Sequence, residues 1–163
     1  MNKNKKEYKI IIIAIIILVL IDQLLKFIIL KVGDKTLIDG VLSFHMTENK
    51  EGTYGISSQS TITYVITNLM VIAIVYKFIT SQNQFVDKKT KVFLTLIIAG
   101  GISNCIDRIF RGYVVEFISI EKLPIFNLAD IYILIGWVSM VAIFTAFTAN
   151  EIKIRKIEKE NKK

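Results

Sequence analysis

The sequence predicts an all-α membrane protein with four transmembrane helices and a small β-rich extracytoplasmic platform. Two observations lead to this fold class. First, 53% of the 163 residues are hydrophobic, and the mean hydropathy is +0.52. Second, the apolar residues form four long runs, and most charged residues lie outside them. A membrane-spanning helix needs about 20 apolar residues. The length allows about one domain, so residues 1–163 are predicted to form a single membrane domain.

The first predicted span covers about residues 10–30 and includes the run IIIIAIIILVLI. Lysines before an apolar run are also typical of a secretory signal peptide. However, this run is followed by Asp22, Gln23 and Lys26 and not by a small-residue cleavage site. We therefore predict that the first span is a helix that stays in the protein.

Three further spans are predicted at about residues 62–79, 92–110 and 125–149. Each is far longer than a typical strand, and none alternates between apolar and polar residues as a half-buried strand does. A helix satisfies its own backbone hydrogen bonds in lipid, which an open sheet cannot do. All four spans are therefore predicted to be helices.

The distribution of basic residues predicts the orientation of these helices. Of the 21 Lys and Arg residues, 14 lie in the terminal tails (1–9 and 150–163) and around the connection between the second and third spans. Cytoplasmic loops carry the excess of Lys and Arg, so both termini are predicted to be cytoplasmic. The net charge of +7 then reflects topology and contact of the tails with anionic lipid. No nucleic-acid partner is predicted.

The two segments on the opposite side, 31–61 and 111–124, are predicted to face outward. Segment 31–61 contains strand-like stretches at residues 36–38 and 41–46, with turn signals at Asp39-Gly40 and Glu51-Gly52. These stretches predict a small sheet on the membrane surface. Segment 111–124 is rich in apolar residues and is predicted to lie at the membrane interface.

The scarcity of cysteine and histidine limits the chemistry. Cys105 is the only cysteine and His45 the only histidine, so the chain cannot form an internal disulfide. One residue of each type is also too few for a zinc site built from His and Cys. We predict no metal and no organic cofactor. Cys105 is predicted to be a small buried apolar residue.

Polar residues inside the spans are the candidates for function, because ionisable side chains in a membrane are costly. Asp22 and Lys26 are spaced i, i+4 and can pair on one helix face, which could be no more than a local ion pair near the interface. The third span carries a polar stripe flanked by Ser103 and Arg108; its members are Gly100, Asn104, Asp107 and Arg111. Such a stripe can serve helix packing, but this combination exceeds what packing requires.

Three carboxyl groups are predicted to lie at a similar depth near the outer membrane boundary. Asp107 ends the third span, Glu116 follows it, and Asp130 shares a helix face with Asn127 at the start of the fourth span. Asp130 could also serve as a helix cap or dipole partner. Two carboxyls that share a site at low dielectric hold one proton between them. The spacing leaves two candidate pairs open, Asp107 with Asp130 and Glu116 with Asp130.

Five motifs in chain order resemble those of the bacterial lipoprotein signal peptidase family, also called signal peptidase II. The match extends over nearly the whole chain. Asp22-Gln-Leu-Leu-Lys26 resembles D-Q-x-x-K, and Asn49 with Tyr54-Gly55 resembles N-x-G-x-x-[FW]-G. The remaining three, resembling G-x-x-x-N-x-x-D-R, G-x-V-V-D-F and F-N-x-A-D, are Gly100-Gly-Ile-Ser-Asn-Cys-Ile-Asp-Arg108, Gly112-Tyr-Val-Val-Glu-Phe117 and Phe126-Asn-Leu-Ala-Asp130.

The resemblance implies a membrane aspartic endopeptidase of the bacterial cytoplasmic membrane, with its active site at the outer face. It implies cleavage of prolipoproteins on the amino side of a diacylglyceryl-modified cysteine. Glu116 and Asp130 would be the catalytic pair, and Asp107 would support the site. The other supporting or substrate-binding residues would be Asn49, Asn104, Arg108, Asn127, Asp22 and Lys26. The implied partners are diacylglyceryl-modified prolipoproteins, membrane lipid and globomycin-like inhibitors.

Three positions depart from the family pattern. Glu116 stands where the family has a catalytic Asp, and Ser103 stands where it has Gly. Glu51 occupies another Gly position, unless a one-residue slip lets Gly52 fill it. These departures favour a divergent member. They keep open the alternative of a weakened or non-catalytic paralogue that binds lipidated peptides or peptidase-directed antibiotics. A small transporter is less well supported, because the polar residues gather at one end of the spans.

Overall fold

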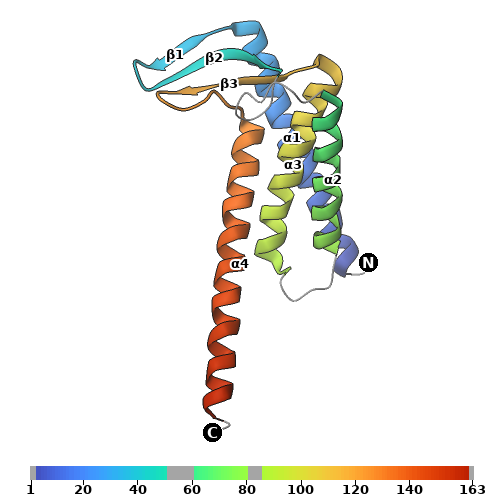
Figure 1. The fold of residues 1–163 in the computed structure, drawn as a ribbon. Coiled ribbons are helices and arrows are strands. Elements are labelled where there is room, and N and C mark those ends of the chain that lie inside the picture. Colours follow the sequence, from blue (N-terminus) through green and yellow to red (C-terminus); the bar gives the residue numbers. More distant parts are fainter. Residues whose placement is uncertain (1–2, 51–60, 81–85, 162–163) are drawn as a thin grey trace.

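The computed structural model describes residues 3–50, 61–80 and 86–161. It confirms the predicted fold class, with four helices that are long and apolar enough to cross a membrane and a small sheet at one end of the bundle (Figure 1). In chain order, the elements are α1 (Lys3–Val32), β1 (Lys35–Ile38), β2 (Leu42–Asn49), α2 (Thr61–Thr80), α3 (Lys88–Arg111), β3 (Val114–Ile120) and α4 (Leu128–Glu160).

Helix α3 is the centre of the bundle and packs against the three other helices. In its most apolar window 61% of the residues are buried, against 11% in each of the other helices. The others therefore turn most of their apolar side chains outward, as is expected of helices that face lipid. Cys105 of α3 is buried, as predicted.

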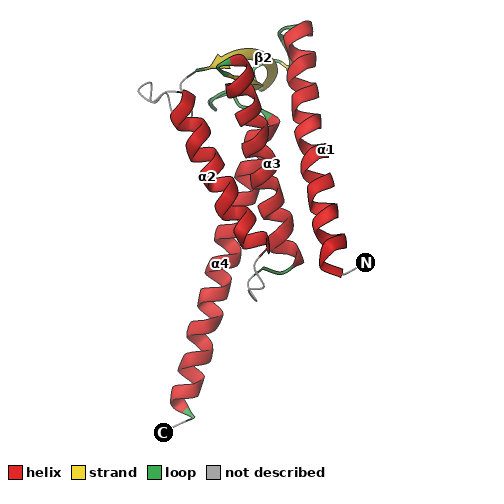
Figure 2. Cartoon of the chain, turned by 90° about the vertical axis from the view of Figure 1, so that its right-hand side faces the viewer, coloured by secondary structure: helices red, strands yellow, loops and turns green. Residues whose placement is uncertain are grey.

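The fourth helix begins later and ends later than the predicted span of 125–149. Phe126 forms a β-bridge with Ile118, and the helix begins only after Asn127. Asn127 is the N-cap of α4 and forms a capping box with Asp130. Such a box satisfies backbone donors at the helix start and so fixes where it begins. At the other end no Pro or Gly interrupts the chain, and the helix continues into the basic tail to Glu160. Figures 1 and 2 both show it extending beyond the rest of the bundle.

Two glycines bring α3 and α4 into close contact. A Cβ atom on Gly100 would lie 2.4 Å from the carbonyl oxygen of Ala129, and one on Gly136 would lie 2.8 Å from that of Phe93. Both contacts are with backbone, which cannot move aside as a side chain can. A Cβ atom on the neighbouring Gly101 would make only ordinary contacts, at 3.5 Å. Gly100 thus brings the first turn of α4 close to α3, and Gly136 brings the third turn close to the part of α3 near Phe93.

The sheet is antiparallel with the strand order β1-β2-β3. The segments that were predicted as strand-like form β1 and β2. The third strand was not predicted, since segment 111–124 was expected only to lie at the interface. It forms because β2 offers an unpaired edge, along which Asn49 pairs with Val114 and Thr47 with Glu116. Gly112, in the left-handed conformation (φ 79°), ends α3 and allows the turn into β3.

Candidate active site

Strand β3 carries Glu116 at the end of the bundle, beside the strand that carries Asn49. The side-chain amide of Asn49 donates a hydrogen bond from Nδ2 to Oε1 of Glu116 at 2.6 Å. The next residue toward the helices, Val115, is fully buried. Its backbone N–H donates to Oδ2 of Asp107 at 3.1 Å, and its carbonyl oxygen accepts from Asn127 at 3.2 Å. The strand is therefore fixed to α3 and to the start of α4.

Asp130 lies in the first turn of α4, and both of its carboxyl oxygens accept hydrogen bonds. Oδ1 accepts from Nδ2 of Asn104 at 2.8 Å, and Oδ2 accepts from the backbone N–H of Asn127 at 3.0 Å. The side chain of Asn127 in turn accepts from the backbone N–H of Asp130 at 2.9 Å. Asp130 therefore takes part in the cap of α4, one of the roles that the sequence allowed. The contact with Asn104 of α3 is additional to the cap.

Asn104 joins the three helices α1, α3 and α4. Its Oδ1 accepts from the ammonium group of Lys26 at 3.1 Å and from Nδ2 of Asn127, also at 3.1 Å. Its Nδ2 donates to Asp130. Every polar atom of this amide therefore has a partner on another element.

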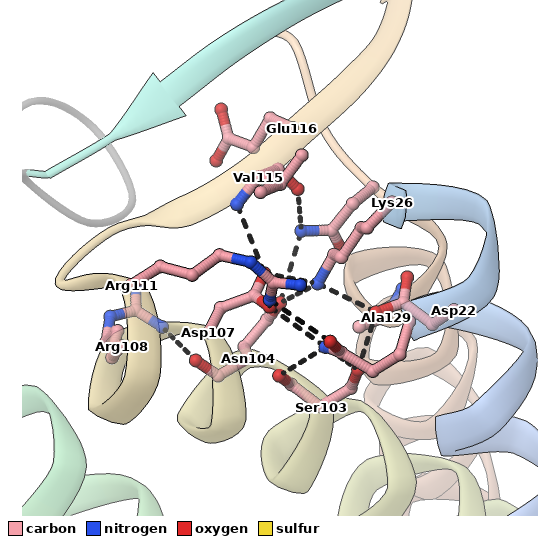
Figure 3. A network of polar contacts seen from close by, with 12 residues as sticks. Asp22, Lys26, Ser103, Asn104, Asp107, Arg108, Arg111, Val115, Glu116 and Ala129 are labelled. Carbon is pink, nitrogen blue, oxygen red and sulfur yellow. Dashed lines mark hydrogen bonds and ion pairs between the residues drawn. The ribbon is translucent and has the colours of Figure 1, made fainter. Parts of the chain in front are cut away.

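A cluster of buried charges lies beside Asn104, as Figure 3 shows. Lys26 forms ion pairs with Asp22 at 2.7 Å and with Asp107 at 2.9 Å, and all three side chains have no exposed surface. Asp22 also accepts from the backbone N–H of Ala129 at 2.9 Å and from the hydroxyl of Ser103 at 2.6 Å. The predicted i, i+4 pair is thus one part of a network that includes α3 and α4.

Asp107 has more partners than any other carboxyl at the site. It pairs with Lys26 and Arg111, and it accepts from Gln23 at 2.9 Å and from the backbone of Val115. Hydrogen bonds and ion pairs of this kind favour the ionised form. Asp107 therefore has the surroundings of a structural carboxylate that holds the elements together.

The structure brings together almost all of the predicted site residues that it describes. Arg108 lies at the edge of the group, where its Nη1 donates to the carbonyl oxygen of Asn104 at 3.4 Å and its guanidinium lies 5.0 Å from the Tyr64 ring centroid. Glu51, Gly52, Tyr54 and Gly55 lie outside the described residues.

One residue of the network was not predicted. Gln23 donates from Nε2 to Ser103 and Asp107, and its Oε1 accepts from Arg111 at 3.1 Å. The signal was present in the sequence, because Gln23 is a polar residue inside a membrane span and lies next to Asp22.

The surroundings of Glu116 favour its protonated form. Burial raises the pKa of its carboxyl above the usual value, and the charge of Asp130 raises the pKa further, while the hydrogen bond from Asn49 opposes both. The two carboxyls therefore interact electrostatically. A protonated carboxyl beside an ionised one can supply a general acid and a general base at the same site.

Comparisons with known proteins show what the chain is similar to. A family model described as Signal peptidase (SPase) II matches residues 13–147. The chain is 35% identical to a lipoprotein signal peptidase of Halalkalibacterium halodurans over 76% of this chain and 84% of that protein. It is 36% identical to one of Staphylococcus aureus over 86% of this chain and 90% of that protein.

Two solved bacterial membrane enzymes, both studied by the in meso method, share the fold. One has a TM-score of 0.78 and is 26% identical, over 87% of this chain and 91% of that one. The other has a TM-score of 0.71 at the same identity, over 82% of this chain and 91% of that one.

Proposed function

Because the chain belongs to the signal peptidase II family, we propose that it removes signal peptides from prolipoproteins as an aspartic endopeptidase. Glu116 and Asp130 are its catalytic pair. The observation that carries this proposal is that the charge of Asp130 raises the pKa of the Glu116 carboxyl, while each carboxyl accepts a hydrogen bond from a fixed amide donor, Asn49 or Asn104. Asp107 is the other candidate partner of Asp130, and it is less suitable because two cations and two N–H groups already hold it.

The reaction needs only water and the two carboxyl groups. The ionised carboxyl takes a proton from water as the water oxygen bonds to the scissile carbonyl carbon. The protonated carboxyl gives its proton to the carbonyl oxygen. When the tetrahedral intermediate collapses, the C–N bond breaks, the leaving nitrogen takes the first proton, and the second returns to its carboxyl. The pair is thereby restored.

We propose that the substrate carries diacylglycerol on the cysteine that follows the cleaved bond. The site lies at one end of helices whose outer surfaces are apolar, with exposed side chains such as Leu24, Phe27 and Phe110 near that end. Acyl chains can pack there while the peptide reaches the polar end of the bundle. Globomycin-like inhibitors are expected to occupy the same place.

The test of the function is processing of a purified prolipoprotein by the purified protein in detergent or vesicles. We expect a gel shift from the precursor to a smaller product when the cysteine carries diacylglycerol. The matched control is the same precursor without the lipid, which we expect to remain uncleaved. Failure to process several lipidated precursors would favour the alternative, a non-catalytic paralogue that binds lipidated peptides. The observation that supports this alternative is the Glu at position 116, where the family pattern has Asp.

We also propose that both termini are cytoplasmic and that the site opens at the outer face of the bacterial cytoplasmic membrane. The support is the concentration of 14 of the 21 basic residues at one end of the spans. Reporter fusions after residues 45 and 118 should read external, and a fusion after residue 85 should read internal. An external reading at residue 85 would contradict the proposed orientation of the whole site.

A further inference from the structure

Lys26 reaches the proposed catalytic pair through another residue. We propose that Lys26 is a positioning residue: by holding Oδ1 of Asn104 it directs the Asn104 amide N–H to Asp130, so that Asp130 is the ionised base and Glu116 the protonated acid. This inference rests on the proposed function and assigns a role to each carboxyl of the pair.

The first step of the argument is the orientation of the Asn104 amide. An ammonium group can only donate hydrogen bonds, so the Asn104 atom that faces Lys26 at 3.1 Å must be the oxygen. Nδ2 of Asn127 is also a donor and contacts the same oxygen at 3.1 Å. Two donors, one in α1 and one at the N-cap of α4, thus exclude the flipped amide. Nδ2 of Asn104 must therefore face Asp130, where it lies 2.8 Å from Oδ1.

The second step is the difference between the two carboxyls. Asp130 accepts an N–H on each oxygen, from Asn104 and from the backbone of Asn127. Hydrogen bonds from N–H groups to a carboxyl favour its ionised form. Glu116 accepts one such bond, from Asn49. Both carboxyls are partly buried, which opposes ionisation of either, so the number of N–H donors is what distinguishes them. The shared proton therefore belongs on Glu116.

The third step concerns the other charges near the pair. Asp130 interacts with Lys26 and Asp22 of α1, and Glu116 interacts with Asp130, Arg108 and Lys26. The positive charge of Lys26 acts on both carboxyls in the same sense, so it does not by itself decide which of them holds the proton. The Asn104 amide that Lys26 orients makes the difference, because it donates to Asp130.

The test compares two variants that differ only at Lys26. Replacing Lys26 alone would leave Asp22 and Asp107 buried without their cation, and the protein could fail to fold. The reference is therefore Asp22→Asn, which keeps the contact of Lys26 with Asn104. The comparison variant is Asp22→Asn combined with Lys26→Met, which removes one charge of each sign and leaves Arg111 to pair with Asp107.

We expect the double variant to have a kcat about 10- to 100-fold below that of the reference, with KM changed much less. The double variant lacks both the oriented donor and the cation, so Asp130 becomes protonated at a higher pH than in the reference. The acid limb of the pH–rate profile should therefore move to higher pH by about one unit. An unchanged acid limb in a folded, active double variant would show that Lys26 is only structural.

A second variant keeps the inference testable if the double variant does not fold. Asn104→Asp retains an oxygen for Lys26 and replaces the amide donor toward Asp130 with a second carboxyl oxygen. It should move the acid limb in the same direction, and an acid limb at the wild-type pH would overturn the inference. If the wild type itself processes no lipidated precursor, the proposed function fails and this inference fails with it. If the wild type is active, these variants test the inference alone.

Discussion

Asp130→Asn is expected to reduce cleavage of a lipidated prolipoprotein by at least ~10²-fold, because an amide cannot accept a proton from water. The fold should survive the change. Asn retains one oxygen that can accept a hydrogen bond at the start of α4, where Asp130 now caps the helix with Asn127. Initial rates from the gel-shift assay measure the effect, and thermal unfolding of the purified variant shows whether the bundle is intact.

Asp87→Asn is the matched control, because Asp87 caps α3 and accepts a hydrogen bond from the backbone of Thr90 at 2.8 Å. It makes the same chemical change at the start of a helix, at the opposite end of the bundle, and Asn caps about as well as Asp. Its cleavage rate should stay near that of the wild type. EDTA should not alter the rate, since one His and one Cys are too few for a His/Cys zinc site. Wild-type cleavage by Asp130→Asn, or loss of activity with EDTA, would contradict the aspartic mechanism.

Glu116→Gln is expected to be inactive, with a loss of at least ~10²-fold. Gln keeps an oxygen that can accept from Asn49, which now donates to Glu116 at 2.6 Å, but it has no proton to give to the scissile carbonyl. The size of the side chain and its contact with Asn49 on β2 are therefore nearly unchanged. A lower rate in this variant then reports the loss of the acidic proton. The wild-type rate should fall on the alkaline side as the pair loses its remaining proton. Because the pKa of Glu116 is raised, this loss begins above the pH at which an ordinary Glu ionises.

Glu116→Asp is expected to cleave at least as fast as the wild type. Aspartate is the residue that the family pattern has at this position, and it shortens the side chain by about one carbon–carbon bond. A displacement of roughly 1 Å can change a rate ~10²-fold, and the shorter side chain also has less conformational entropy to lose. The same gel-shift assay is applied to the wild type, Glu116→Asp and Glu116→Gln, and it tests whether Glu116 is catalytic. If Glu116→Gln cleaves like the wild type, Asp107 returns as the partner of Asp130. If all three are inactive on several lipidated precursors, the binding function is favoured.

The sequence was sufficient to predict the helices but not the third strand or the helix ends. Long apolar runs identify spans because lipid imposes one local requirement, hydrophobic length. The pairing of β3 with β2 depends on residues about 70 positions apart, such as Thr47 and Glu116, and no local pattern reports it. Helix α4 continues to Glu160 because helix formation does not stop where the apolar run stops.

The members of the site could be predicted better than their contacts. Asp22, Lys26 and Asn104 stood out because a polar side chain inside a membrane span is costly. The i, i+4 spacing predicted the pair of Asp22 with Lys26, and that pair is present at 2.7 Å. The contacts of Lys26 with Asn104 and Asp107 depend on how α1 packs on α3. The spacing along the chain carries no information about that packing.

The buried charges of α1 also bear on the order in which the protein can be assembled. An Asp or Lys in the middle of a membrane helix costs about 2.5–3.5 kcal/mol during insertion. Helix α1 can tolerate Asp22 and Lys26 because its most apolar window has a mean hydropathy of 2.7, the highest of the four spans. Their partners Ser103 and Asp107 and the backbone of Ala129 lie on helices that the ribosome makes later. A nascent chain that has inserted only α1 and α2 therefore holds Asp22 and Lys26 paired only with each other, and their contacts with Ser103, Asp107 and Ala129 can form only after α3 and α4 have been made.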